Sequence, residues 1–304
     1  MSKILVTGGA GFIGSHIVEV LLINDYQVVV LDDLSTGSLE NLPIHNNLIF
    51  YKCDLARDPL EEIFKKENPN FIIHLAAQVS VGNSIADPFT DASTNILGSI
   101  RLIELSKKYN VEKFIAASSA AVYGIPKYLP IDEGHPTEPI SQYGLSKITM
   151  ERYIILSGIP YMIFRFSNVY GPRQKSSKES GVIAIFDAAM RKDKVINVFG
   201  DGGQIRDFIY VEDIANICLE AIRSDITNDV FNVSTNTGIT INELVAIMSD
   251  IYSYNKKVNY LVARNGEIRE SVLLNTKIIN SFKFRHDTFL SLQLGIKKMR
   301  QSNV

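Results

Sequence analysis

The sequence has few cysteines, no excess of positive charge and no long apolar run, and each of these absences excludes a class of protein. Its 304 residues include only two cysteines, Cys53 and Cys218, which lie far apart and outside any Cys-x-x-Cys pair. Two isolated thiols exclude a disulfide framework and a cysteine zinc site, and they favour a reducing cytoplasm. The histidines lack metal-ligand spacing as well, so we expect no bound metal.

Charge is balanced, because 31 lysines and arginines face 33 aspartates and glutamates, for a formal net charge of -2. No overall positive field therefore draws the protein to nucleic acid or to anionic lipid. Nowhere do 18 apolar residues follow one another, so we expect no transmembrane helix. Glycines within residues 8–14 also interrupt the apolar start, which argues against a signal peptide.

Short, continuously apolar segments alternate with helical patterns over the first half of the chain. We expect strands at residues 3–7, 28–31, 48–51, 71–75, 113–117 and 161–166, and helices at 12–22, 58–66, 93–109 and 142–156. Apolar strands between helices indicate a parallel sheet covered on both faces, the doubly wound or Rossmann arrangement of α/β proteins.

After Gly171 this alternation weakens, and a smaller mixed α/β domain is expected. We predict helices at 182–191, 211–223 and 242–252, the last capped by Thr240 or Asn242, and strands at 195–199 and 230–233. The predicted first domain covers residues 1–170, with 208–223 returning to it, and the second covers 171–304. No flexible linker separates them, so we expect two closely packed lobes.

A glycine cluster lies where the first strand turns into the first helix, in Thr7-Gly8-Gly9-Ala10-Gly11-Phe12-Ile13-Gly14. Glycines there permit a tight turn and let the helix N-terminus approach a pyrophosphate. Asp32 ends the second strand about 20 residues further on, where a carboxylate accepts hydrogen bonds from the adenine ribose. The same charge repels a 2′-phosphate, and no arginine lies near it before Arg57, so NAD is preferred to NADP.

Tyr143 and Lys147 are one helical turn apart at the start of a predicted helix, so their side chains share a face. On spacing alone an ordinary exposed pair is the commoner case. A lysine ammonium beside a phenol, however, stabilises the phenolate and moves the tyrosine pKa from about 10 towards the range of a working base. Ser118 and Ser119 end the fifth strand, at the carboxyl edge where doubly wound sheets bind ligands, and can place a substrate hydroxyl against Tyr143. His74, at the end of a buried strand, is interpreted as a structural core residue.

These motifs resemble those of the extended short-chain dehydrogenase/reductase family, also called the NAD-dependent epimerase/dehydratase family of nucleotide-sugar enzymes. The resemblance covers nearly the whole chain and includes Thr7 to Gly14, Asp32 to Gly37, Asp54-Leu55, His74 to Ala77, Asn95, Ser118 to Gly124, Tyr143 to Lys147, Arg165 to Arg173, Phe199 to Asp201 and Arg206 to Asp213. Within the family the chain is most similar to enzymes of the UDP-glucose 4-epimerase type.

The resemblance implies the roles of individual residues and of both domains, with NAD bound by the first domain and a UDP-hexose by the second. The implied NAD-binding residues are Gly8, Gly11, Phe12, Ile13, Gly14, Asp32, Asp33, Thr36, Gly37, Asp54, Leu55, Leu75, Ala76, Ala77, Asn95, Tyr143 and Lys147. The implied catalytic residues are Ser119, Tyr143 and Lys147. The implied substrate-binding residues are Ser119, Tyr143, Asn168, Val182, Asn197, Phe199, Arg206, Arg264 and Ser271. The family further implies a homodimer formed by the helices around residues 93–109 and 142–156.

The reaction expected from the resemblance is 4-epimerisation through a transient 4-keto sugar. Ala120 and Ala121 stand where the family's 4,6-dehydratases carry Asp-Glu and where its decarboxylases usually keep Glu, and alanine cannot transfer a proton. A small Ser271 replaces the bulky tyrosine of some members and leaves room for an N-acetyl group. A 4,6-dehydratase, a decarboxylase, a reductase and a non-catalytic NAD-binding protein remain alternatives.

Overall fold

The computed structural model describes residues 2–176, 181–263, 266, 268–285 and 288–302, and the chain forms two compact units. Unit 1 comprises Met1–Gly124, Thr137–Arg165 and Ile214–Phe231, and unit 2 comprises Ile125–Pro136, Phe166–Asp213 and Asn232–Val304. Each unit is therefore assembled from separate stretches of the chain. Among the described residues, no helix has both the length and the apolar character needed to cross a membrane.

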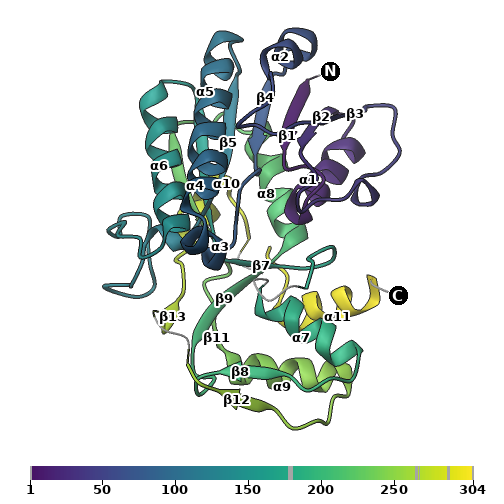
Figure 1. The fold of residues 1–304 in the computed structure, drawn as a ribbon, viewed down its shortest axis with the longest axis vertical. Coiled ribbons are helices and arrows are strands. Elements are labelled where there is room, and N and C mark those ends of the chain that lie inside the picture. Colours follow the sequence, from purple (N-terminus) through teal and green to yellow (C-terminus); the bar gives the residue numbers. More distant parts are fainter. Residues whose placement is uncertain (1, 177–180, 264–265, 267, 286–287, 303–304) are drawn as a thin grey trace. The chain divides into compact units, whose positions relative to one another are not determined.

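Unit 1 is built on a seven-stranded sheet with the order β10-β6-β5-β4-β1-β2-β3 (Figure 1). Its strands are β1 (Lys3–Thr7), β2 (Gln27–Asp32), β3 (Leu48–Lys52), β4 (Phe71–His74), β5 (Lys113–Ser119), β6 (Tyr161–Phe166) and β10 (Asp229–Val233). β1 pairs in parallel with both β2 and β4, and Val6 lies opposite Val30 on one side and Ile73 on the other. The doubly wound fold is thus confirmed, and the strand order reverses between β1 and β4, where such sheets bind ligands.

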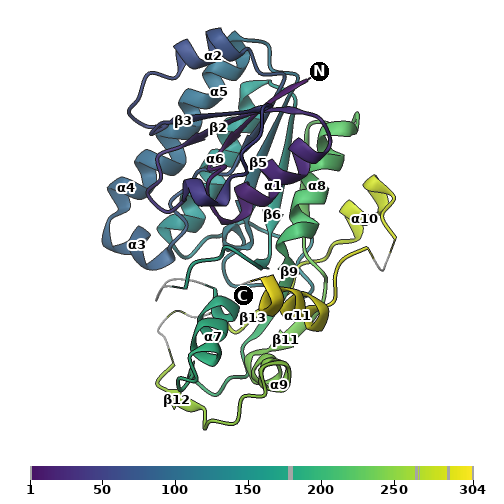
Figure 2. The same cartoon turned by 90° about the vertical axis from the view of Figure 1, so that its right-hand side faces the viewer.

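Helices cover both faces of this sheet. They are α1 (Phe12–Ile23), α2 (Glu61–Glu67), α3 (Val81–Ala86), α4 (Pro88–Ala92), α5 (Gly98–Lys108), α6 (Gln142–Ser157) and α8 (Val211–Arg223), with short 3-10 turns η1 (Leu39–Asn41) and η3 (Ala120–Val122) and a π-helical turn η2 (Ser93–Leu97). On one face, Phe64 of α2, Leu102 of α5 and Met150 of α6 belong to one buried cluster. On the other face, α1 and α8 lie side by side (Figure 2). Arg223 of α8 donates to Asn24, just after α1, at 2.6 Å.

The segment before β5 differs from its predicted single helix over residues 93–109. The structure has α3, α4, the π-helical turn η2 and then α5. Local signals for the two extra helices exist, because Ser80 and Asp87 act as N-caps and Pro88 occupies the first turn of α4. Both helices have six residues or fewer, which is too short for an apolar periodicity to be visible.

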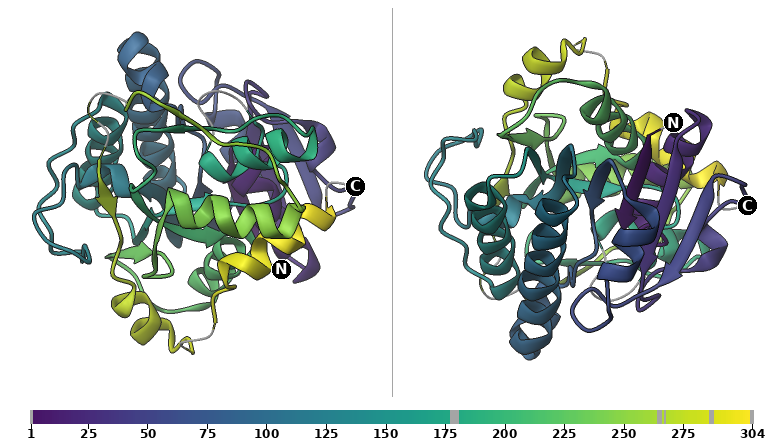
Figure 3. Two further views of the ribbon diagram at one scale, coloured as in Figure 1. Left: turned by 90° about the horizontal axis from the view of Figure 1, so that it is seen from below. Right: turned by 90° about the horizontal axis from the view of Figure 1, so that it is seen from above.

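Unit 2 is organised around β9 (Ile205–Tyr210). β9 pairs with β11 (Gly238–Thr240), β13 (Glu270–Ser271) and β7 (Asn168–Tyr170), while β8 (Asn197–Phe199) pairs separately with β12 (Asn259–Leu261). Its helices are α7 (Val182–Arg191), α9 (Ile241–Tyr252), α10 (Thr276–Phe282) and α11 (Leu292–Ser302). Phe186 of α7, Met248 of α9 and Ile296 of α11 belong to one buried core. These three helices lie close together in the view from below (Figure 3, left).

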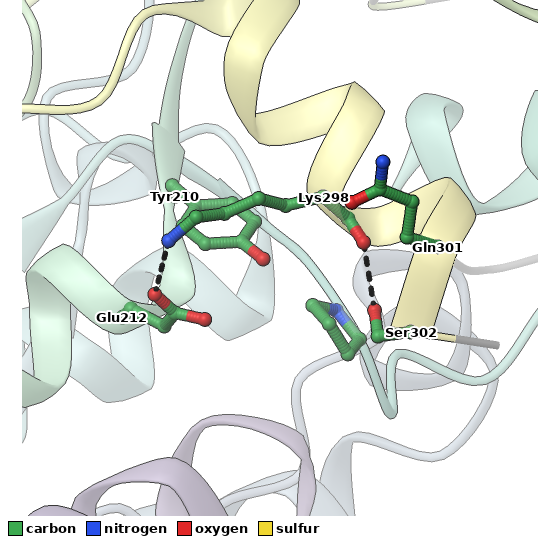
Figure 4. A pocket seen from close by; sticks show the side chains of 6 residues that line it. Tyr210, Glu212, Lys298, Gln301 and Ser302 are labelled. Carbon is green, nitrogen blue, oxygen red and sulfur yellow. Dashed lines mark hydrogen bonds and ion pairs between the residues drawn. The ribbon is translucent and has the colours of Figure 1, made fainter.

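The last helix of unit 2, α11, is fixed to the end of β9 and to Glu212 and Asp213, the residues of unit 2 in the first turn of α8. Lys298 forms an ion pair of 3.0 Å with Glu212, and its ammonium lies 5.8 Å from the centre of the Tyr210 ring (Figure 4). The N–H of Leu290 donates to Asp213 at 2.9 Å. The pocket drawn there is lined by Pro172, Tyr210, Glu212, Lys298, Gln301 and Ser302. None of the predicted site residues lines this pocket, so we do not assign the activity to it.

Candidate active site

The turn between β1 and α1 is so tightly packed that glycine is required at two of its positions. Gly8 has φ +69°, and a Cβ added there would lie 2.8 Å from the backbone nitrogen of Ala76. A Cβ on Gly14 would lie 2.1 Å from the carbonyl oxygen of Gly8. The N-cap residue of α1 is Gly11, so the helix has no side-chain cap, and it has no acidic residue in its first turn. Its N-terminal N–H groups and dipole therefore favour an anion such as a pyrophosphate.

Asp32 holds the loop after β2 beside this glycine turn. Its carboxylate is 6% exposed and accepts the N–H groups of Ala10 at 3.0 Å and Leu34 at 2.8 Å. The N–H of Ser38 also donates to the carbonyl of Ala10 at 3.0 Å, which brings the loop carrying Thr36 and Gly37 to the same turn. The predicted ribose carboxylate is thus fixed at the carboxyl end of β2, whereas Asp33 is exposed.

The other predicted NAD-binding residues follow the neighbouring strands. Asp54 and Leu55 come directly after β3, and Leu75 to Ala77 come directly after β4. The hydroxyl of Thr7, at the end of β1, accepts the N–H groups of both Leu75 and Ala76 at 3.2 Å. The structure therefore brings these residues to one edge of the sheet, formed by the carboxyl ends of β1 to β4, and the close-packed glycines fit a bound dinucleotide.

The three predicted catalytic residues lie where β5 meets α6. Ser119 ends β5, and its hydroxyl accepts the N–H of Ala121 at 3.2 Å. Tyr143 is the second residue of α6, and its N–H donates to Ser84 at 3.1 Å. Lys147, only 3% exposed, donates from Nζ to the carbonyl of Ala117 on β5 at 2.9 Å.

α6 approaches the end of β5 very closely. A Cβ added to Gly144 would lie 2.5 Å from the carbonyl oxygen of Ala121, so only glycine fits there without displacement of the backbone. The N-cap residue Ser141 accepts the N–H of Gly144 at 3.1 Å and fixes the start of the helix. This contact holds the first turn of α6, which carries Tyr143, against the end of β5, which carries Ser119.

The expected lowering of the Tyr143 pKa by Lys147 is not found in the chain itself. Burial raises the pKa of Tyr143 to about 12, the hydrogen bond with Ser119 lowers it in part, and the charge of Asp91 raises it further. Burial likewise lowers the pKa of Lys147 to about 8, against the opposing charges of Asp91 and Glu151. Lys147 is bonded to the Ala117 carbonyl, so desolvation of the phenol outweighs the influence of the ammonium.

His74 has the structural role predicted for it. Its Nδ1 lies 2.7 Å from the hydroxyl of Thr7, and its Nε2 lies 2.8 Å from the hydroxyl of Ser99. Burial lowers the pKa of His74 to about 3, with a further contribution from Lys147. The ring is therefore neutral at physiological pH and connects β1, β4 and α5.

Two buried acids near Lys147 were not singled out from the sequence. Glu151 is 0% exposed and pairs with Arg165 at 2.6 Å, and it also accepts a hydrogen bond from Ser118. Asp91 is 1% exposed and accepts from Asn95 at 3.0 Å. Helical spacing is the signal that could have located them, since Glu151 follows Lys147 by one turn and Asp91 precedes Asn95 by one turn.

Unit 2 brings together three of the predicted substrate-binding residues on or beside β9. Arg206 lies on β9 opposite Ser271 of β13. Asn168 begins the neighbouring strand β7, and its side chain donates to the carbonyl of Asp207 at 2.9 Å. Arg206 is held through Nη1, which donates to the carbonyl of Ile205 at 2.9 Å.

The remaining substrate-binding candidates belong to other elements of unit 2. Phe199 ends β8, and its carbonyl accepts the side-chain amide of Gln204, next to β9, at 2.7 Å. Asn197 begins β8 and is exposed, and Val182 begins α7. Arg264 lies outside the described residues.

A Rossmann sheet with a glycine-lined dinucleotide cradle, and with Ser, Tyr and Lys gathered at its carboxyl edge, defines an enzyme of the short-chain dehydrogenase/reductase class. The family model described as "NAD dependent epimerase/dehydratase family" matches residues 4–234. The chain belongs to this family, which confirms the resemblance seen in its motifs and makes NAD its cofactor.

Similar proteins cover almost the entire chain. A putative UDP-glucose 4-epimerase of Methanocaldococcus jannaschii is 42% identical over 301 residues, which span 97% of this chain and 96% of the relative. The UDP-glucose 4-epimerase of Thermotoga maritima, solved with UDP-glucose, has a TM-score of 0.94 at 40% identity and covers 98% of this chain and 97% of its own. The UDP-N-acetylglucosamine 4-epimerase of Methanobrevibacter ruminantium M1, solved with UDP-N-acetylmuramic acid, has a TM-score of 0.93 at 36% identity. The match covers 99% of this chain and 97% of that structure's chain.

Proposed function

We propose that the protein is an NAD-dependent UDP-hexose 4-epimerase that interconverts UDP-glucose and UDP-galactose, with the corresponding N-acetylhexosamine pair as further substrates. The observation that carries this proposal is the pair Ala120 and Ala121 in η3, directly after the hydroxyl of Ser119. Neither side chain can transfer a proton, so elimination of water from the sugar lacks its acid and base. Ser119, Tyr143 and Lys147 are all present, as reversible oxidation at C4 requires.

The residues of unit 1 supply the proton chemistry. Bound NAD supplies a positively charged ring and reversible oxidation of C4. Tyr143 accepts the proton of the C4 hydroxyl, while the hydroxyl of Ser119 orients that group. Burial holds the pKa of Tyr143 at about 12, so its phenolate form depends on positive charge at the site, and Lys147 is the chain's own source of that charge.

Residues of unit 2 anchor the nucleotide while the sugar reorients. The guanidinium groups of Arg206 and Arg264 are suited to bidentate contacts with a diphosphate. A diphosphate held in this way leaves the planar 4-keto sugar free to present its other face before C4 is reduced again. The net redox change is zero, so NAD is regenerated in each cycle.

Ser271 supports the inclusion of N-acetyl sugars. It lies opposite Arg206 in the β9–β13 pair. The family resemblance places this small side chain where some members carry a bulky tyrosine, which favours a larger sugar. A similar protein is an epimerase named for UDP-N-acetylglucosamine.

A product assay tests the proposal. Purified protein is incubated separately with UDP-galactose and UDP-N-acetylgalactosamine, with NAD either omitted or supplied far below the substrate concentration, and the sugars are analysed by chromatography. The expected products are the C4 epimers without net formation of NADH. A 4-keto-6-deoxy sugar would indicate a dehydratase, loss of the carboxylate from a UDP-uronic acid control a decarboxylase, and stoichiometric use of NADH a reductase. Bound NAD without any turnover would indicate a binding protein.

We also propose that two copies associate through α5 and α6 and that the protein is cytoplasmic. Large apolar side chains are exposed on α6 and on the segment that leads into α5, namely Leu145 (55%) and Leu156 (84%) of α6, Phe89 (77%) of α4 and Leu97 (53%) of η2. Leu145 and Leu156 are about three turns apart and therefore share one face of α6. A second copy that buries these side chains accounts for their exposure in a single chain. Two free, buried cysteines are compatible with a reducing compartment.

A further inference from the structure

A buried polar stripe runs along the helical segment that faces α6. Asp91 in α4, Asn95 in η2 and Ser99 in α5 follow one another at intervals of one turn and are 1%, 1% and 0% exposed. The side-chain amide of Asn95 donates to the hydroxyl of Ser146 on α6 at 3.0 Å. η2 is a π-helical turn, a distortion that is frequent at functional sites. The stripe thus reaches α6 between Tyr143 and Lys147.

Asp91 is the charged member of this stripe, and its closest partners carry no charge. Its Oδ1 accepts from the side-chain amides of Asn95 at 3.0 Å and Gln78 at 3.1 Å. Withdrawal from water raises the pKa of the Asp91 carboxyl, and a positive charge nearby opposes that rise and compensates the lost hydration.

The neighbouring charges identify that compensating group. Glu151 already has its own cation, because Arg165 contacts it through Nη2 at 2.6 Å and Nε at 3.0 Å. Lys147 is 3% exposed, and its bond to the Ala117 carbonyl is to a neutral acceptor. The charges of Asp91 and Glu151 both raise the pKa of Lys147, and the effect of Asp91 is the larger. Asp91 and Lys147 are therefore complementary buried charges.

We propose that Asp91 is a positioning residue of the active site, which keeps the Lys147 side chain charged and, through Asn95 and Ser146, holds the first turns of α6 in place. The inference deepens the proposed epimerase function and rests on it for its effect on turnover. Asp91 acts through other residues and is not expected to touch substrate or NAD.

The charge of Asp91 acts in the same direction on two titrating groups. It raises the pKa of Lys147, which burial lowers to about 8, and it raises the pKa of Tyr143 beyond the effect of burial. The other charged or titratable groups around the lysine are Glu151 on α6, which is paired with Arg165, and His74 on β4, which is neutral. Removal of the Asp91 charge should therefore lower both pKa values together.

The first test is the pH profile of kcat/KM for Asp91→Asn. We expect both limbs of the profile, which together report Tyr143 and Lys147, to shift to lower pH by about one unit. The matched control is Asp87→Asn on the same short helix, because Asp87 is exposed and asparagine also caps helices. Its profile should not shift. A loss of kcat for Asp91→Asn with both limbs unchanged would reveal a merely structural role and overturn the proposal.

A second test needs no turnover and therefore separates this inference from the epimerase proposal. The free energy of unfolding is measured in urea for Asp91→Asn, Lys147→Met and the double variant. Complementary buried charges predict that the double variant loses less stability than the sum of the two single losses. Strict additivity would overturn the proposal. If Asp91→Asn alone does not fold, recovery of folded protein in the double variant supports the pairing, and failure to recover contradicts it.

Discussion

Tyr143 is the proposed proton acceptor, and a single substitution removes its hydroxyl with little other change to the side chain. We expect Tyr143→Phe to lower turnover of UDP-galactose on the order of 10³-fold, the usual contribution of a positioned general base. The rest of the NAD cradle, from Gly8 to Ala77, is unaltered by this change. Bound NAD, measured by its absorbance after release from denatured protein, should remain at the wild-type level.

The control for this substitution lies on the same helix. Tyr153 of α6 is 47% exposed, so Tyr153→Phe removes a phenolic hydroxyl that points away from the buried side of the helix. Its turnover should equal that of the wild type. Undiminished activity of Tyr143→Phe would exclude Tyr143 as the base.

The burial of His74 predicts a pH-dependent contribution to stability. The pKa of His74 is about 3 in the folded chain and about 6.5 when unfolded, so below pH 6.5 only the unfolded chain takes up a proton there. Folded protein therefore loses stability as the pH falls through this range. His74→Gln removes that loss, although it costs stability at pH 7 because the bonds to Thr7 and Ser99 are weakened.

Urea unfolding at two pH values measures this effect. The stability deficit of His74→Gln relative to the wild type should be about 2 kcal/mol smaller at pH 5 than at pH 7. His45→Gln is the control, because His45 is exposed and its deficit should not depend on pH in this way. An equal deficit of His74→Gln at both pH values would contradict a buried neutral ring.

Sequence reasoning could place the main chemical groups of the site but not their electrostatics. The glycines of residues 8–14, Ser119 and the pair Tyr143 and Lys147 occur in local patterns whose strand and helix context is visible in the chain. The sign of the pKa shift of Tyr143 depends on how deeply α6 is buried against β5, and Asp91 reaches the site from a separate helix. Such information arises only from tertiary packing.

At the level of elements, the N-terminus of α9 carries both residues of a helix-capping motif. The hydroxyl of Thr240 accepts the N–H of Glu243 at 3.1 Å, and the carboxylate of Glu243 accepts the N–H of Thr240 at 2.8 Å, which together form a capping box. Thr240→Ala should cost about 1 kcal/mol of unfolding free energy. Thr237→Ala, an exposed threonine outside the helix, should cost much less in the same urea titration, and equal losses would contradict the capping role.

Elements with a continuous apolar pattern were predicted closely, whereas short and polar ones were not. The strands β1 and β6 match their expected ranges, because both are buried segments flanked by clear turn or helix signals. β9 carries the charged residues Arg206 and Asp207 within its six residues, so its sequence does not read as a strand. β13 has only two residues and exists through its pairing with β9, which depends on contacts distant in sequence.

At the scale of the whole molecule, the composition and the motif order were sufficient for the fold class, and the family match agrees with them. The sequence led us to expect a return of residues 208–223 to the first domain, but the placement of residues 125–136 in unit 2 was beyond local patterns. Ile125–Pro136 belongs to unit 2 although both flanking segments belong to unit 1, and Ile131 forms a bridge with Leu273 far along the chain. No periodicity in the sequence predicts such a pairing, because the two residues meet only when the rest of unit 2 has folded.

The proposed dimer is the remaining whole-molecule property, and it predicts a change of mass on a single substitution. Light scattering of the purified protein should give twice the chain mass of 33.9 kDa. Leu156→Glu should give a single chain, because Leu156 is 84% exposed on α6 and a carboxylate there would lose its hydration on association. Ile44→Glu, which alters a fully exposed side chain in the β2–β3 connection, should remain dimeric. A monomeric wild type would exclude the proposed dimer. A dimer that persists in Leu156→Glu would show that the contact lies elsewhere.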